Sequence, residues 1–171
     1  RALALDPGEA EPVRSNYGYP MACVSPDSLR RGTDLGAGSG ARPERWWRLA
    51  IAVEAVGTMS AAPETTFASV TRPPQFGRAI GSFQAVQHRL AECAVLVEGS
   101  RWLAYEAAFF MNAELSNRAG DGAMGNFAQS EQRAATAAAY ATAAAGRVFA
   151  ETHQLTGAMG FTREHDLHVW S

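Results

Sequence analysis

The hydrophobic pattern of the chain changes near Pro43. Before that point apolar residues show no sustained alternation, although residues 22–24 are compatible with a short edge strand. After it, apolar side chains recur three and four residues apart, beginning with Trp46, Leu49 and Val53. Because an α-helix turns once every 3.6 residues, this spacing predicts helical structure for most of the remaining chain.

The first predicted helix begins at Pro43, since the first turn of a helix tolerates a missing N–H group. Pro63 is expected to kink, end or restart this helix, with a second stretch over residues 65–70. The sequence Arg-Pro-Pro at 72–74 is predicted to be non-helical, because each proline favours an extended conformation in the residue before it.

Two longer helices follow. One is predicted over about 83–115, with Ser82 as its N-cap, and residues 116–125 are predicted to form a glycine-rich loop. The other is predicted to run from an N-cap at Ser130 to about residue 156, where Gly157 ends it. Its alanine-rich stretch favours helix and allows close packing of neighbouring helices.

Together these segments predict a mainly α fold. Residues 164–171 have the pattern of the first turns of a further helix, so residues 44–171 are predicted to form an up-and-down helix bundle that is cut off in its last helix. Residues 1–43, rich in proline and glycine, are predicted to be an irregular segment or the remnant of a β-domain.

Composition narrows the possible partners. The 171 residues are 47% hydrophobic and carry a net charge of −2, which gives no electrostatic reason to expect binding to nucleic acid or a membrane surface. No apolar run approaches the roughly 20 residues that span a bilayer. Cys23 and Cys93 have neither metal-ligand nor redox spacing, so we expect buried free thiols and a cytoplasmic protein.

Two separated motifs carry a family resemblance. The stretches QFGRAIGSFQAVQHRLAE (75–92) and HQLTGAMGFTREHDLH (153–168) resemble the C-terminal helical domain of acyl-CoA dehydrogenases. The resemblance covers about residues 45–171. It implies a flavoenzyme in which a base takes the α-proton of an acyl-CoA thioester and FAD takes the β-hydride. It further implies a homo-oligomer, or a hetero-oligomer with another acyl-CoA dehydrogenase subunit.

The resemblance also implies roles for individual residues. Phe76 and Gln84 match positions that touch the flavin nucleotide of a neighbouring subunit. Gln154, Gly157 and Ala158 match a Gln-x-x-Gly-Gly motif whose backbone approaches the adenosine diphosphate part of FAD. A structural alternative remains for each group: Phe76 can anchor its turn in the core, and Gly157 can act as a helix C-cap beside a surface glutamine.

The substrate side departs from the family pattern. Arg48 matches an arginine that lines the acyl-CoA cleft, but Trp47 stands where some members carry the catalytic glutamate. Since tryptophan cannot abstract a proton and general base catalysis needs a carboxylate, no catalytic residue is assigned. Pro73 replaces an arginine that pairs with the pyrophosphate, and Arg72 lies one position earlier. Loss of such a charge-assisted contact is expected to lower FAD affinity roughly ten- to a hundredfold.

Three functions therefore remain open. The chain is an FAD-binding and oligomerising domain of an acyl-CoA dehydrogenase, a non-catalytic subunit or remnant of a mixed oligomer, or a helical interaction module without a ligand. His165 and His168 could share a metal if both lay on one helix, but family members carry similar residues here without a metal, so none is assigned.

Overall fold

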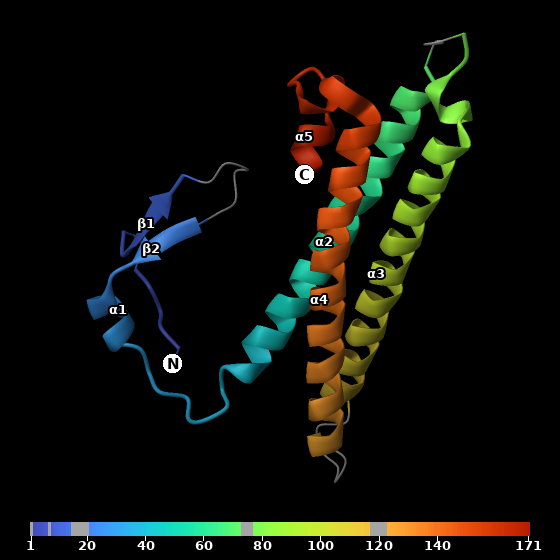
Figure 1. Cartoon of the computed structure of the whole chain (residues 1–171). Coiled ribbons are helices and arrows are strands. Elements are labelled where there is room, and N and C mark those ends of the chain that lie inside the picture. Colours follow the sequence, from blue (N-terminus) through green and yellow to red (C-terminus); the bar gives the residue numbers. More distant parts are fainter. Residues whose placement is uncertain (1, 7, 15–20, 73–76, 117–122) are drawn as a thin grey trace. The chain divides into compact units, whose positions relative to one another are not determined.

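The computed structural model describes residues 2–6, 8–14, 21–72, 77–116 and 123–171, with the backbone alone at 123–126. The chain divides into two compact units, Arg1–Glu44 and Arg45–Ser171. Figure 1 shows the elements of both units along the chain, and each unit is described by itself below.

The first unit contains a two-stranded antiparallel sheet. Strand β1 (Ala10–Val13) pairs with β2 (Met21–Val24), so that Ala10 lies opposite Val24 and Val13 opposite Met21. The strand indicated by residues 22–24 is thus confirmed. Helix α1 (Pro26–Arg30) follows, and the Ser25 hydroxyl caps it by accepting the Ser28 N–H at 3.0 Å.

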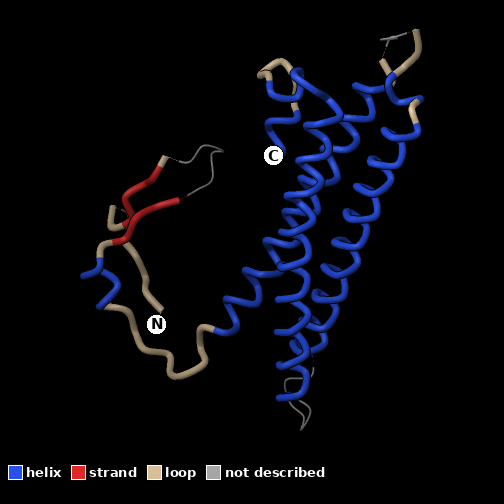
Figure 2. Tube along the Cα trace, in the orientation of Figure 1, coloured by secondary structure: helices blue, strands red, loops and turns tan. Residues whose placement is uncertain are grey.

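The second unit is built on three long helices, as the tube in Figure 2 makes plain. These are α2 (Ala41–Val70), α3 (Gln84–Ser116) and α4 (Ala123–Thr156), which alternate in direction. Short helical pieces join and end them: η1 (Ile80–Ser82), η2 (Gly157–Phe161) and α5 (Leu167–Trp170). The predicted up-and-down helix bundle is confirmed.

Small residues bring α3 and α4 close together. Their shared core includes fully buried alanines at 107, 137 and 141, so the two backbones meet over little side-chain bulk. Gly99 gives room for the Tyr140 ring, because a Cβ atom at residue 99 would lie 2.9 Å from the Tyr140 hydroxyl and the ring would have to shift. The alanine-rich stretch of the sequence therefore supplies the packing surface of the bundle.

Ion pairs fix the antiparallel register of α3 and α4. Three ion pairs follow one another along α3: Arg89 with Glu151 at 3.3 Å, Glu92 with Arg147 at 2.9 Å and Glu106 with Arg133 at 3.1 Å. Along these pairs the residue number increases on α3 and decreases on α4, as it must for two antiparallel helices. Because exposed pairs each contribute only about 0–1 kcal/mol, they specify register more than they stabilise the fold.

A buried arginine joins all three long helices. Arg45 of α2 is 2% exposed and forms an ion pair with Glu114 of α3, and its guanidinium also donates to the Ser130 hydroxyl of α4. The Ser130 hydroxyl donates in turn to Glu114 at 2.7 Å, and the Arg45 guanidinium lies 3.8 Å from the ring centre of Phe127. Ser130 is thus not the predicted N-cap: α4 begins seven residues earlier, and this hydroxyl serves the buried charge.

Helix α2 neither ends nor restarts at Pro63, and fully buried Met59 and Ala62 hold the turn before it in place despite the lost hydrogen bond. Two further local predictions were wrong. The Ser82 hydroxyl donates to the carbonyl of Ala79 at 2.7 Å and so does not cap α3. Cys23 is exposed, whereas Cys93 is buried as expected.

Candidate functional site

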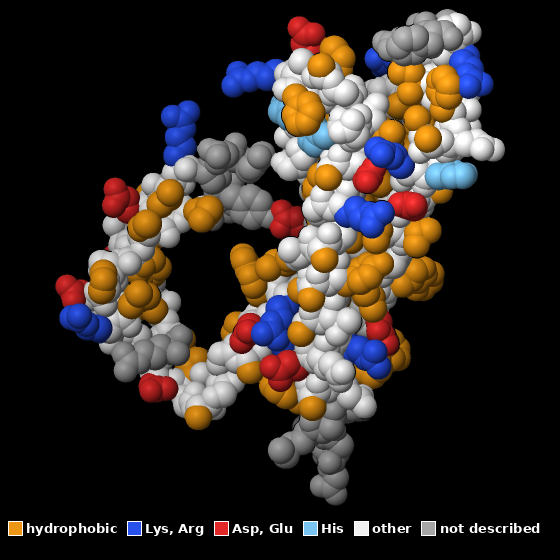
Figure 3. Space-filling view, in the orientation of Figure 1, with side chains coloured by type: hydrophobic (Ala, Val, Ile, Leu, Met, Phe, Trp, Pro, Cys, Tyr) orange, Lys and Arg blue, Asp and Glu red, His pale blue; other side chains and the backbone are white. Residues whose placement is uncertain are grey.

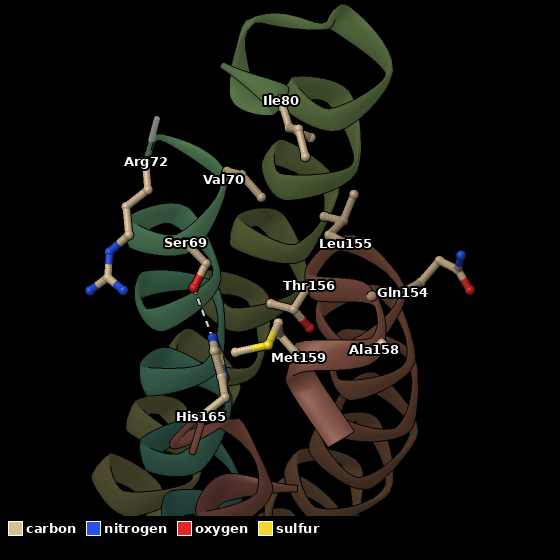
Figure 4. Close-up of a pocket in the computed structure, with 11 residues that line it drawn as sticks. Ser69, Val70, Arg72, Ile80, Gln154, Leu155, Thr156, Ala158, Met159 and His165 are labelled. Carbon is tan, nitrogen blue, oxygen red and sulfur yellow. Dashed lines mark hydrogen bonds between the residues drawn. The ribbon is translucent and has the colours of Figure 1, made fainter. Parts of the chain in front are cut away.

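A cavity of about 490 Å³ lies at one end of the bundle, where α2 ends and α4 passes into η2. Figure 4 shows how the side chains around it are arranged. The lining comes from the end of α2, from η1, from the end of α4 with η2, and from the segment before α5. The lining residues are Ser69, Val70, Arg72, Ile80, Gln154, Leu155, Thr156, Gly157, Ala158, Met159 and His165.

The turn after α4 shapes one wall of the cavity. Helix α4 ends at Thr156 because Gly157 adopts φ +59°, a left-handed conformation that favours glycine. Three residues on, Gly160 allows the chain to pass over the helix end, since a Cβ atom there would lie 2.1 Å from the Thr156 hydroxyl. The compact turn leaves Gly157 and Ala158 at the cavity with almost no side chain in the way.

His165 connects the opposite wall to α2. Its Nδ1 accepts the backbone N–H of Leu167 at 3.2 Å, so the proton of the neutral ring lies on Nε2. Nε2 therefore donates to the Ser69 hydroxyl at 2.8 Å, and that hydroxyl can donate to the Thr65 carbonyl at 3.2 Å. Figure 4 shows this bond crossing from the segment after η2 to α2.

Three of the residues singled out by sequence meet at this cavity. Gln154, Gly157 and Ala158 all line it, as does Ile80 of the first motif, and Arg72, which lies just before that motif, lines it as well. In Figure 4 the Arg72 and Gln154 side chains extend outward from opposite sides of the cavity. The η1 segment and the C-terminal end of α4 therefore bring the two motifs to one space, although Ile80 and Gln154 are 74 positions apart.

The remaining predicted residues lie elsewhere. Gln84 is the exposed first residue of α3 and is not part of the lining, and Phe76 lies outside the described residues, as does Pro73. Arg48 is half-buried near the start of α2. At 1.5 Å per residue, about 30 Å of helix separates it from Ser69. The structure thus does not bring Arg48 to the cavity.

Ser69 and His165 belong to the site but were not expected there. Ser69 is one of several hydroxyl residues along α2, and nothing in its local sequence distinguishes it from Thr65 or Thr66. His165 drew attention only as a partner for His168, whose Nδ1 instead lies 2.7 Å from the carbonyl of His165. Only the packing of the chain end on α2 reveals their contact.

The lining carries several groups that can hold an anion. Arg72 offers a guanidinium, Gln154 an amide and Ser69 a hydroxyl, which are the groups that commonly hold phosphates. Among the described lining residues none carries a carboxylate. The cavity can therefore bind and position a phosphate-bearing ligand, but its described lining offers no carboxylate base.

Comparisons with known proteins all point to one family. A family model described as acyl-CoA dehydrogenase, C-terminal domain, matches residues 45–170. The acyl-CoA dehydrogenase IpdE2 of Mycobacterium tuberculosis is 31% identical over 120 residues, which cover 70% of this chain and 32% of that protein. The chain thus spans about a third of the length of the curated relatives it matches.

Solved structures agree. A chain from work on the electron transferring flavoprotein of Acidaminococcus fermentans superposes with a TM-score of 0.59 at 28% identity, covering 72% of this chain and 29% of that one. A glutaryl-coenzyme A dehydrogenase in complex with glutaryl-CoA superposes with a TM-score of 0.57 at 25% identity, covering 74% and 29%. Among the described residues, no helix combines the length and hydropathy that crossing a membrane requires.

Proposed function

The chain belongs to the acyl-CoA dehydrogenase family through its C-terminal domain, and from this membership we propose that it supplies a helical half-site for FAD together with oligomer contacts. The half-site is the cavity at the ends of α2 and α4. In the family, FAD accepts the β-hydride of an acyl-CoA thioester. This chain's own part is to hold the adenosine diphosphate end of that cofactor.

The observation that carries the proposal is the convergence of two distant motifs on one cavity. Gln154, Gly157 and Ala158 line it from α4 and η2, Ile80 of the first motif lines it from η1, and Arg72 lines it from just after α2. The volume of about 490 Å³ lies within the range of roughly 300–1,000 Å³ for ligand pockets. A small-residue wall allows a nucleotide to approach the backbone, and a guanidinium neutralises the diphosphate.

Arg72 has a specific role in this proposal. Position 73, which holds the family's arginine, is a proline here, so the cation must come from another residue. Arg72 is the one arginine among the described lining residues, and its exposed, flexible side chain can turn inward toward a bound diphosphate. Arg72 thereby offsets part of the loss at Pro73.

On the substrate side, we propose that Arg48 contacts acyl-CoA in a cleft at the other end of α2, by its match to the family's arginine. The same region favours a second function, that of a non-catalytic subunit paired with an active dehydrogenase. Trp47 stands at one of the family's positions for the catalytic glutamate and is 65% exposed, and tryptophan cannot act as the base. Residues 1–43 would then be the remnant of a β-domain.

Titration of the 171-residue chain with FAD, followed by flavin absorbance and fluorescence polarisation, tests the proposal. Arg72→Ala should weaken binding about 10- to 100-fold, and Gln154→Ala about 3- to 10-fold, because charged and neutral hydrogen bonds differ in strength. Gln132→Ala, an exposed glutamine on the same helix, is the matched control and should change nothing. Absence of FAD binding, or equal affinity in all four proteins, would contradict the half-site.

A further inference from the structure

An exposed aromatic ring lies beside the cavity. Phe161 is the last residue of η2, and its side chain is 74% exposed. The imidazole of His153, on α4, covers one face of this ring, with the two ring centres 4.7 Å apart and the planes 24° from parallel. Figure 3 shows hydrophobic and histidine side chains together on the surface of the end of the bundle that carries η2 and α5. The other face of the Phe161 ring is open to solvent.

The turn after α4 holds these two rings together. Gly160 brings the chain back over the helix end, where a Cβ atom would lie 3.4 Å from Nδ1 of His153. That Nδ1 atom is buried and has no hydrogen-bond partner among the described residues. The imidazole is therefore held by packing against Gly160 and Phe161, and the stack presents the Phe161 ring in a defined orientation.

The open ring borders the cavity. In a 3₁₀-helix, side chains three residues apart lie on the same side, and each residue advances the helix by about 2.0 Å. Phe161 therefore follows Ala158, a lining residue, on one side of η2 and lies about 6 Å further along it. Figure 4 shows Ala158 on the same side of the cavity as Gln154, which is the neighbour of His153 in α4. The ring stack thus lies just outside the wall that Gln154 and Ala158 form.

The chemistry inside the cavity differs from that at this border. Arg72, Gln154 and Ser69 can hold phosphate oxygens, but none of the described lining residues is Phe, Tyr or Trp. A nucleoside diphosphate is divided in a similar way, because a single ribose joins its charged diphosphate to a flat, uncharged base. Bases bind proteins by stacking on exposed aromatic rings. The open face of Phe161 is the kind of surface that such a base needs.

From these observations we propose that Phe161 is the platform on which the adenine ring of a nucleotide stacks when its diphosphate lies in the cavity. His153 is a positioning residue, because it fixes the platform from behind. The proposal rests on the flavin half-site proposed above and adds to it the residue that contacts the base. Adenine bound here can be that of FAD or of free ADP, since both contain adenosine diphosphate.

Binding of ADP and of inorganic pyrophosphate to the full chain, measured by isothermal titration calorimetry, separates the platform from the diphosphate site. Phe161→Ala should weaken ADP binding about 5- to 100-fold, as loss of a stacking ring does, and leave pyrophosphate binding unchanged. Phe161→Trp should retain ADP binding, because it keeps a large ring. Phe109→Ala is the matched control: this phenylalanine is 69% exposed and lies about 38 Å along α3 from Gln84.

Proton NMR of ADP provides a second readout, which a merely structural role of Phe161 would not produce. The adenine ring protons should shift upfield on binding, because protons above an aromatic face are shielded by its ring current. The upfield shift should be lost in Phe161→Ala and kept in Phe161→Trp. Since Phe161 is exposed, circular dichroism should show the same helix content in both variants.

Three results would overturn the platform. Equal ADP affinity in Phe161→Ala and the unmodified chain would refute it and leave the flavin half-site standing. A parallel loss of ADP and pyrophosphate binding in Phe161→Ala would also refute it, because Phe161 would then support the cavity wall and not the base. An unmodified chain that binds neither ligand would refute the half-site itself, and the platform with it.

Discussion

His165 donates a hydrogen bond to Ser69 at 2.8 Å, across 96 positions of the sequence. This hydrogen bond ties the chain after η2 to α2, and both residues line the same cavity. The cavity wall that includes Met159 therefore depends on a polar contact between two chain segments as well as on the apolar packing of fully buried Leu167.

Ser69→Ala should lower the free energy of unfolding by about 1 kcal/mol, because it removes one part-buried hydrogen bond and leaves His165 Nε2 without its acceptor. Urea denaturation measures the change. FAD affinity should fall in parallel, since the wall loosens. Thr65→Ala, one turn earlier on α2, serves as the control with normal FAD binding. Unchanged stability and affinity in Ser69→Ala would show that the contact does not hold the wall.

Glu114→Gln should cost about 3–5 kcal/mol of unfolding free energy, because it leaves the guanidinium of Arg45, 2% exposed, without its counter-charge. The matched change Glu92→Gln breaks the exposed pair with Arg147 and should cost about 0–1 kcal/mol. Chemical denaturation of both variants gives the two values. Losses of equal size would mean that the buried network contributes no more than a surface pair.

Gly157→Ala should destabilise the chain by about 1–2 kcal/mol, because residue 157 has φ +59°, where a Cβ atom is strained. Gly146→Ala, inside α4 with open space around it, should instead stabilise by up to about 1 kcal/mol. Thermal unfolding distinguishes the two glycines. If both substitutions stabilise the protein, the helix does not end at Gly157 as described.

Stability should decline in alkaline solution. Burial, followed by the nearby charges of Glu151 and Glu92, raises the pKa of the Cys93 thiol above its ordinary value of 9.0. Because the native state holds this proton more tightly than the unfolded chain, the contribution is complete below about pH 9 and is lost as the pH rises through the native pKa. Urea midpoints between pH 7 and pH 10 should fall, and less so in Cys93→Ala. Identical slopes would remove Cys93 as the cause.

Sequence periodicity predicts the long helices well because each must bury an apolar side, and a 3.6-residue repeat records that requirement directly. It misjudges their ends. Ser130 has the chemistry of an N-cap, but its hydroxyl is used by Arg45, a residue 85 positions away. Similarly, Pro63 lacks an N–H, yet α2 passes through it because packing of Met59 and Ala62 outweighs one lost hydrogen bond.

At the candidate site, too, the sequence predicts what depends on local spacing and misses what depends on long-range packing. Gln154, Gly157 and Ala158 are identifiable from their motif, because their spacing reflects one local turn. That Arg72 shares their cavity depends on α2 and α4 ending side by side, which no local pattern encodes. The contact between Ser69 and His165 likewise exists only once the chain end folds back. Phe76 and Pro73 lie outside the described residues, so their predicted roles stay predictions.

If the cavity receives the adenosine diphosphate end of FAD, as we propose, ADP alone should compete with FAD for it. Chain loaded with FAD is titrated with ADP or, separately, with FMN, and released flavin is followed by fluorescence. We predict that ADP displaces FAD with an affinity within about tenfold of that of FAD, and that FMN does not. Displacement by FMN alone, or FAD binding that does not respond to ADP, would show that the cavity does not hold this end of the cofactor.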